Sequence, residues 1–189
     1  MLSVFKLGRL SLLCALAVSM AACDEDLGLD EWNATPDTVT LYSLSRPEFI
    51  NQPSAFDFIN HIGLRVESPT STGNWDVALL DQGNGLALVP AGGFEGQNSR
   101  AALSVITGAS FDELEEAPED TTRFSSNPVA LSPGQVLAVR TRRAPCAFSN
   151  SVRYGKVKII DVNAAAGTVR FETIVNPFCN DRSLIPPED

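Results

Sequence analysis

The stretch that decides the fold lies in the C-terminal third of the chain, where residues 135–175 read QVLAVRTRRAPCAFSNSVRYGKVKIIDVNAAAGTVRFETIV. Apolar and polar residues alternate along residues 154–162 and 168–175, and a period of two is typical of strands. Residues 135–141 form a further apolar run. Short links join the three runs, so the stretch predicts an antiparallel meander. On its last strand we expect four side chains to face the core: Val169, Phe171, Thr173 and Val175.

Two cysteines flank this meander. Cys146 follows its first strand, and Cys179 follows its third. In an up-down-up meander, the ends of the first and third strands lie at the same edge of the sheet. We therefore predict a disulfide between Cys146 and Cys179, which requires an oxidising compartment. The alternative is a pair of free thiols.

Shorter strand patterns precede the meander. Alternation marks residues 38–44 and, with one interruption, residues 56–66. Residues 75–80 and 86–89 predict a hairpin, because the turn between them is rich in Gly, Asn and Asp. Residues 101–107 fit either a strand or a helix.

One segment has a helical signal. Ser110 and Glu113 match a capping box, and Pro118 closes the segment, so we expect one or two helical turns there. All other segments with a regular apolar–polar alternation have the period of two that is typical of strands. The sequence thus predicts an all-β protein, an antiparallel β-sandwich or flattened barrel with one short helical turn.

The N-terminus carries a targeting pattern. Lys6 and Arg9 precede an apolar run, residues 10–18, which is shorter than the ~20 residues that span a bilayer. Residues 20–23 read Met-Ala-Ala-Cys, and this resembles the lipobox of bacterial lipoproteins. The resemblance implies cleavage before Cys23 and attachment of a diacylglycerol to its sulfur. The alternative is an ordinary secreted protein in which Cys23 has no such role.

These patterns divide the chain into four parts. We expect a signal peptide at residues 1–22, a lipidated Cys and acidic tether at 23–37, a single β domain at 38–182 and a flexible tail at 183–189. The expected location is the bacterial cell envelope, as a membrane-anchored lipoprotein that faces the periplasm or the cell surface. The choice between inner and outer membrane stays open.

The charge balance limits the partners. The chain has a formal net charge of −9, and removal of Lys6 and Arg9 with the signal would make it −11. Nucleic-acid binding needs a basic face, so nucleic acid is not an expected partner. Anionic headgroups would repel such a domain, so we expect membrane contact only through the lipid anchor.

Few residues suggest chemistry. His61 is the only histidine in the chain, and it lies where the strand pattern breaks, so we interpret it as a surface or turn residue. No nucleophile elbow, zinc spacing or phosphate loop occurs. The sequence therefore predicts no enzyme, no cofactor and no metal site.

Basic residues gather on two adjacent strand ends of this acidic chain: Arg140, Arg142, Arg143, Arg153, Lys156 and Lys158. One interpretation is that they pair with Asp161, Glu172 or the acidic turn after Ser110. The functional interpretation is a contact surface for an anion or acidic partner, centred on the loop that contains Cys146. Its candidate residues are Arg140, Arg142, Arg143, Phe148, Arg153 and Lys156.

Several strand motifs occur in a suggestive order. They are VTLYSL at residues 39–44, WDVAL at 75–79, VRT at 139–141, YGKVKI at 154–159 and GTVRF at 167–171. This order resembles the HmuY-type haem-binding lipoproteins, and the resemblance implies an all-β fold. It also implies paired axial ligands for haem iron, typically two histidines, which one protomer with a single His does not provide.

Two functions follow as expectations. The first is a lipid-anchored, non-catalytic binding or interaction domain of the bacterial envelope with an unknown ligand or envelope partner. The alternative is an HmuY-like lipoprotein that scavenges haem or another small ligand.

Overall fold

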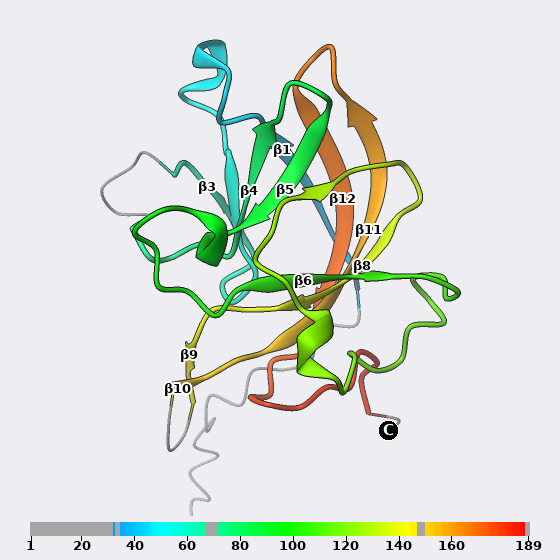
Figure 1. Cartoon of the computed structure of the whole chain (residues 1–189). Helices are drawn as coiled ribbons and strands as arrows, with labels where there is room; N and C mark the ends of the chain where they lie inside the picture. Colours follow the sequence, from blue (N-terminus) through cyan, green and yellow to red (C-terminus); the bar gives the residue numbers. More distant parts are fainter. Residues whose placement is uncertain (1–31, 33–34, 67–71, 147–149, 188–189) are drawn as a thin grey trace, which may run out of the picture.

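Two antiparallel sheets pack face to face as a sandwich (Figure 1). The computed structural model describes residues 32, 35–66, 72–146 and 150–187. The first sheet has the strand order β1 (Asp37–Tyr42), β12 (Thr168–Val175), β11 (Tyr154–Asn163), β8 (Val136–Arg140) and β6 (Ala102–Ile106). The second has the order β3 (Ile62–Leu64), β2 (Ala55–Asp57), β4 (Val77–Asp81), β5 (Leu86–Pro90) and β7 (Val129–Ala130). The short strands β9 (Ala144–Pro145) and β10 (Asn150–Ser151) pair with each other.

The predicted meander is confirmed as β8, β11 and β12, which are neighbours in the first sheet. The four β12 side chains expected to face inward are all buried: Val169, Phe171, Thr173 and Val175. They are buried because the second sheet covers this face, as alternate side chains of a strand point to the same side. The segment 102–106, which fits a strand or a helix by sequence, is strand β6 and pairs with β8.

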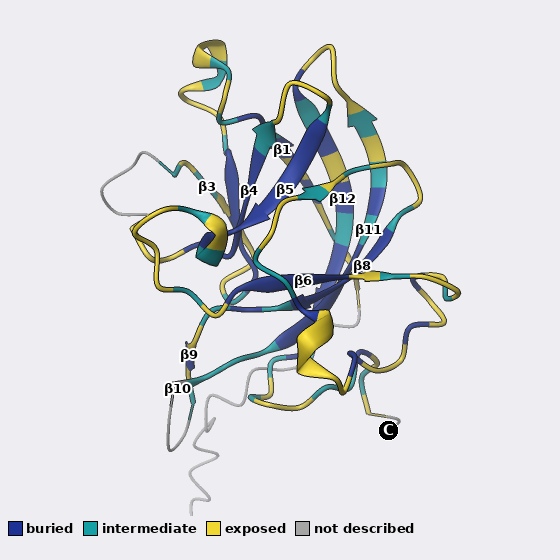
Figure 2. Ribbon diagram, viewed as in Figure 1, coloured by how far each residue is buried: buried dark blue, intermediate teal, exposed yellow. Residues whose placement is uncertain are grey.

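Aromatic side chains fill the space between the sheets. The ring of Phe56 from β2 lies 5.0 Å from that of Phe58 and 5.8 Å from that of Phe171 on β12, both edge to face. Leu79 and Leu137 pack into the same core and are fully buried. Figure 2 shows this pattern, with buried residues along the strands and exposed residues in the connecting turns.

The first sheet is buried on its outer face as well. Phe111, Leu114 and Phe124, from the segment between β6 and β7, cover Ala138 and Ile174. The C-terminal segment lies beside this cover (Figure 1), since the backbone N–H of Ala117 donates to the carbonyl of Arg182 at 2.9 Å. A sheet covered on both faces has little exposed apolar surface of its own.

The prediction of a flexible tail at residues 183–189 is wrong for its first residues. Leu184 has no exposed surface and belongs to the cluster on the outer face of the first sheet. Its backbone N–H donates to the carbonyl of Glu115 at 2.7 Å, and the side-chain amide of Asn176 donates to the carbonyl of Ser183 at 3.0 Å. The domain therefore extends past residue 182, because an apolar side chain there completes the core.

The capping box forms, but the helix does not continue. The backbone N–H of Ser110 donates to Glu113 Oε2 at 2.9 Å, and the N–H of Glu113 donates to Ser110 Oγ at 3.3 Å. One further bond runs from the N–H of Leu114 to the carbonyl of Ser110. The N–H of Ala117 then bonds to the C-terminal segment, so the chain makes a single turn. The helical turns elsewhere in the described residues are short 3-10 turns: Pro47–Phe49, Ala91–Gly93 and Thr121–Arg123.

The cysteine prediction agrees with the structure. Cys146 follows β9, Cys179 follows β12, and their Cα atoms lie 6.3 Å apart in a disulfide-bonded pair. The bond joins residues 33 positions apart and closes the edge where the meander's first and third strands end.

Most of the predictions for the N-terminal 37 residues concern positions that the structure does not describe. The signal peptide, Cys23 and the first part of the tether lie outside the described residues. Two positions of the expected tether belong to the domain, since Asp37 begins β1 and the ring of Trp32 lies 6.2 Å from that of Phe178. Among the described residues, no helix has the length and apolar character that a membrane crossing requires.

Candidate functional site

One mostly buried arginine joins the two sheets. Arg142 follows β8 of the first sheet, and its guanidinium meets Asp57 at the end of β2 in the second. Nη1 donates to Asp57 Oδ1 at 2.6 Å, and Nη2 donates to Asp57 Oδ2 at 2.9 Å. Nη1 also lies 3.0 Å from Oδ2 of Asp76, which precedes β4. The bidentate geometry fits a guanidinium to a carboxylate and fixes both in one orientation.

Asp76 also binds backbone groups from both sheets. Its Oδ1 accepts the N–H of Arg142 at 2.6 Å, and its Oδ2 accepts the N–H of Phe58 at 2.8 Å. The carboxyl group is fully buried. This network therefore holds the connection after β8 against the second sheet and sets the backbone position of Arg143.

The two carboxyl groups have opposite pKa shifts. Burial raises the pKa of Asp76 to about 6, although the charge of Arg142 and two backbone N–H groups act to lower it. Burial also acts to raise the pKa of Asp57, but hydrogen bonds from Arg142 and Asn60 outweigh it and leave this pKa below its ordinary value. A single guanidinium thus interacts with two carboxylates. It stabilises the charged form of Asp57, whereas burial still disfavours the charged form of Asp76.

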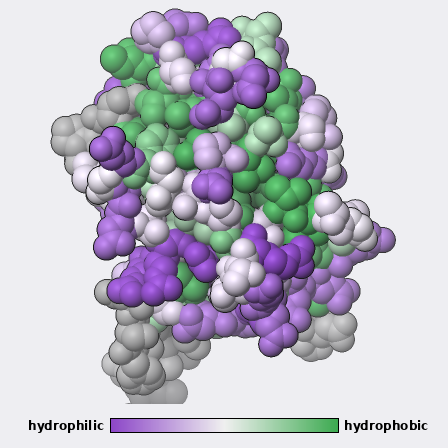
Figure 3. All heavy atoms as spheres, viewed as in Figure 1, coloured by the Kyte–Doolittle hydropathy of each residue, from purple (hydrophilic) through white to green (hydrophobic). Residues whose placement is uncertain are grey.

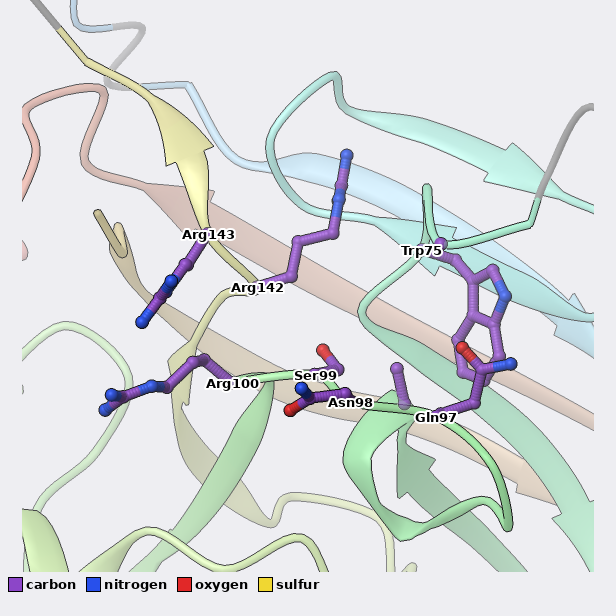
Figure 4. Close-up of a pocket in the computed structure, with 9 residues that line it drawn as sticks. Trp75, Gln97, Asn98, Ser99, Arg100, Arg142 and Arg143 are labelled. Atoms are coloured by element: carbon purple, nitrogen blue, oxygen red, sulfur yellow. The ribbon is translucent and has the colours of Figure 1, made fainter. Parts of the chain in front are cut away.

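A pocket of about 380 Å³ opens beside this network (Figure 4). Trp75 lines it from the segment that enters β4, and residues 97–100 line it from the segment that enters β6. The side chain of Arg142 points away from Asn98, whereas Arg100 and Arg143 extend to the same side of the pocket (Figure 4). Trp75 is almost fully buried and its ring meets that of Phe94 edge to face at 5.0 Å, so it forms a fixed wall.

A second pocket of about 270 Å³ adjoins the first. Arg100 and Arg143 line both pockets, and Arg140 lines the second. The other lining residues of the second pocket are Thr121, Ser151, Val152, Tyr154 and Asn180. We call Arg100, Arg140 and Arg143 the arginine rim.

The geometry of the sheet fixes the arginine rim. β6 and β8 are antiparallel with Ala102 opposite Arg140, so the start of β6 lies beside the end of β8. Nε of Arg140 donates to the carbonyl of Arg100 at 3.1 Å, and its guanidinium lies 5.5 Å above the ring of Phe124. In Figure 3, strongly hydrophilic atoms gather on the surface near β9 and the start of β6.

The predicted contact surface is wrong for Lys156. Arg142 lines the first pocket, but its guanidinium is engaged in the ion pair between the sheets. Lys156 is 3% exposed, because it lies on the outer face of β11 beneath the segment after β6. Its Nζ donates to the carbonyl of Leu114 at 3.0 Å and lies 4.9 Å above the ring of Phe111. Burial lowers the pKa of Lys156, while the charges of Asp112 and Glu115 act to raise it.

The other basic residues have different surroundings. Arg140 and Arg143 belong to the arginine rim, Arg153 is half-buried, and Phe148 lies outside the described residues. The backbone N–H of Arg153 donates to Thr141 Oγ1 at 2.9 Å. Lys158 lies 4.0 Å from Glu172, so the pairing interpretation is confirmed for this residue.

His61 is an exposed turn residue between β2 and β3, as the sequence predicts. Its φ of 56° lies in the left-handed region, which suits a tight turn. Nδ1 lies 2.6 Å from Oδ2 of Asp37 on β1. Among the described residues, no group of three or more His, Cys, Asp and Glu is placed to hold a metal ion.

Sequence reasoning missed several residues of this site. Asp57 and Asp76 are charged residues at the ends of apolar strands, and a buried charge of this kind needs a partner. That signal was present in the sequence, but it did not identify Arg142 as the partner. Residues 97–100 carry no strand or helix pattern and gave no signal.

The carboxylates of the network and the open side chains of the pocket differ in their surroundings. The carboxylates of Asp57 and Asp76 are occupied by Arg142 and by backbone N–H groups. The open side chains of the first pocket are guanidinium, amide and hydroxyl groups.

Comparisons with known proteins find no matching family model, no matching curated protein and no matching solved structure.

Proposed function

We propose that this protein is a non-catalytic binding domain of the bacterial envelope, held on a membrane by a lipid on Cys23. The observation that carries the binding function is the open polar pocket beside the ion pair of Arg142. Its walls come from connecting segments that precede β4 and β6 and follow β5 and β8, so the packing of the two sheets sets their separation. A pocket with walls fixed in advance loses little freedom when a ligand enters.

The buried network supports this function because it stabilises the pocket's shape. Arg142 contacts the second sheet through Asp57 and Asp76, both fully buried. Arg143 follows directly in the chain and lines the pocket. A residue next to a fixed network presents its guanidinium from a fixed backbone position.

The tether supports the anchoring half of the proposal. Cys23 lies nine positions before Trp32, whose ring lies 6.2 Å from that of Phe178 in the domain. An extended chain spans ~3.3–3.6 Å per residue, so such a tether reaches up to about 30 Å. The negative charge of the domain favours this separation from anionic headgroups.

Site-specific photo-crosslinking tests the binding function. A photoreactive amino acid replaces the exposed, pocket-lining Asn98, and a control variant carries it at the exposed Asn84 in the turn between β4 and β5. In intact envelopes, we expect a light-dependent adduct at position 98 and none at position 84. Absence of an adduct at both positions, or equal adducts, would contradict a ligand in this pocket.

One observation favours the second candidate, haem or small-ligand scavenging of the HmuY type. Asp37 holds Nδ1 of His61, and no described residue makes a hydrogen bond to Nε2. A carboxylate on one ring nitrogen commonly orients the other toward a metal. Titration with haem should then give a Soret shift that the His61→Ala variant lacks. An unshifted Soret band with the wild type contradicts this candidate.

A further inference from the structure

We propose that the arginine rim binds an acidic oligosaccharide, with sugar carboxylates on Arg100 and Arg143 and sugar hydroxyls on the amide and hydroxyl side chains that line the two pockets. The proposal rests on the proposed binding function and names its ligand class. It does not depend on the lipid anchor.

The first argument is charge. Arg46, Arg142, Arg182 and Lys158 each have a carboxylate oxygen within 4.0 Å. In the part of the chain that the structure describes, no carboxylate lies within that distance of Arg100, Arg140 or Arg143. The chain has 23 acidic and 14 basic residues, so this cluster lacks carboxylates although they are abundant.

The cationic side chains also act on one another. Burial lowers the pKa of Arg140, and the positive charge of Arg100 lowers it further, while Tyr154 acts to raise it. Arg140 nevertheless stays beside Arg100, because its Nε bonds to the carbonyl of that residue and its guanidinium rests on Phe124. Like charges held together favour an anion between or above them.

The second argument is shape. The two pockets, of about 380 Å³ and 270 Å³, share Arg100 and Arg143. These two side chains extend in the same direction (Figure 4), so one elongated ligand can contact both. A single small anion would occupy one pocket and leave the other empty, whereas an oligomer with repeated charges extends across both.

The third argument is the uncharged lining. Gln97, Asn98 and Ser99 line the first pocket, and Thr121, Ser151 and Asn180 line the second. Amides and hydroxyls both donate and accept hydrogen bonds, which suits the hydroxyls of a sugar ring. Guanidinium groups match a carboxylate through two parallel bonds. A ligand with spaced carboxylates and many hydroxyls therefore fits this lining.

Isothermal titration tests the proposal with a trigalacturonate as the probe. Maltotriose, which has no carboxylate, is the neutral control, and an oligoglutamate of equal charge is the acidic-peptide control. We expect trigalacturonate to bind at least tenfold more tightly than either control. We also expect its affinity to fall as salt rises, because exposed charges are screened.

Matched variants locate the site. Arg100→Gln together with Arg143→Gln should weaken trigalacturonate binding at least tenfold. Arg170→Gln makes the same kind of change at an exposed β12 residue that lies opposite Thr40 and Asp161, and it should leave binding unchanged. Since Arg100 and Arg143 are exposed, we expect the denaturation midpoint of the double variant to match the wild type. Asn98→Ala, which keeps every charge, should weaken binding as well.

Several results would overturn the proposal. Equal affinity for trigalacturonate and maltotriose would show that the sugar carboxylates do not contribute to binding. Tighter binding of oligoglutamate would show that the ligand is an acidic peptide. An equal loss of trigalacturonate affinity in the Arg170→Gln variant would show that Arg100 and Arg143 do not form the binding site. If trigalacturonate fails to bind but the photo-crosslink at position 98 persists, the ligand class is wrong and the binding function stands. If both fail, the binding function is wrong.

Discussion

Arg142 links the two sheets through its ion pairs. It bonds to Asp57 and Asp76, which lie 85 and 66 positions away in the sequence. Removal of one partner from a buried ion pair leaves an uncompensated charge, which costs about 3–5 kcal/mol. We expect Arg142→Met, which keeps an unbranched side chain but shortens it and removes the charge, to lower the free energy of unfolding by about that amount in a urea titration.

Arg143→Gln is the matched control at the adjacent position. Arg143 is exposed and has no carboxylate partner among the described residues, so its replacement should change the free energy of unfolding by less than about 0.5 kcal/mol. Equal effects of the two variants would show that the ion pair adds no stability.

Asp76 makes stability depend on pH. Burial raises its pKa from 3.8 to about 6, so the folded protein binds the proton more tightly than the unfolded chain does. The stabilisation from Asp76 is complete below its unfolded pKa and is lost as the pH rises through about 6. A shift of about two pKa units corresponds to about 3 kcal/mol.

The measurement compares wild type with Asp76→Asn in denaturant titrations from pH 4 to pH 7.5. We expect the free energy of unfolding of the wild type, relative to the variant, to decrease as the pH rises. A relative stability that increases with pH would mean that Asp76 has a lowered pKa and that Arg142 outweighs its burial.

Among the elements, the C-terminal segment has an unexpected structural role. Leu184 is fully buried against the outer face of the first sheet, and its neighbours bond to the segment after β6. We expect Leu184→Ala to lower the free energy of unfolding by about 2–5 kcal/mol, because it leaves a cavity. Ile185→Ala is the control, since this side chain is 41% exposed and should cost much less. Equal small effects would mean that the segment is not part of the core.

The meander's edge is closed by the disulfide. The bond between Cys146 and Cys179 spans 33 positions, and a loop of this length stabilises by about 3–4 kcal/mol in the chain-entropy model. We expect the double variant Cys146→Ser, Cys179→Ser to lose about that amount and to keep its β-sheet circular dichroism. Non-reducing mass spectrometry should show the wild type lighter by two hydrogens. Two thiols open to alkylation in native envelopes would contradict the bond.

For the whole molecule, the main prediction concerns location. Cys23→Ser removes the only sulfur that the lipobox resemblance marks for acylation. We expect the wild type to take up radiolabelled palmitate and sediment with membranes, and the variant to do neither, because acyl chains contribute ~0.8 kcal/mol for each buried methylene. Cys179→Ser is a control that should keep the label. An unlabelled wild type that retains residues 1–22 would contradict the anchor.

Much of the fold was predictable from the sequence, because strand patterns are local. The eight residues of β12 match the predicted 168–175, and the cysteine pairing follows from the order of the strands. The capping box was also readable, but its single turn was not, since Ala117 bonds to Arg182 in place of a helical partner. Leu184 was missed because nothing in a short Pro-rich end indicates which surface an apolar residue covers.

The candidate site was far less predictable. The cluster of arginines was visible, but the sequence does not separate Arg142, whose guanidinium is held in an ion pair, from Arg143, which lines the same pocket without a carboxylate partner among the described residues. Adjacent residues differ in this way because the backbone after β8 is held by Asp76 from the other sheet.

By itself, the sequence determined most of the long strands and the meander and indicated the cysteine pair, since alternation along a strand decides which side chains are buried. Only the tertiary structure decided which charges are neutralised and which line a pocket. The reason is distance along the chain: the partners of Arg142 and the walls of the pocket come from segments that meet only when the two sheets pack.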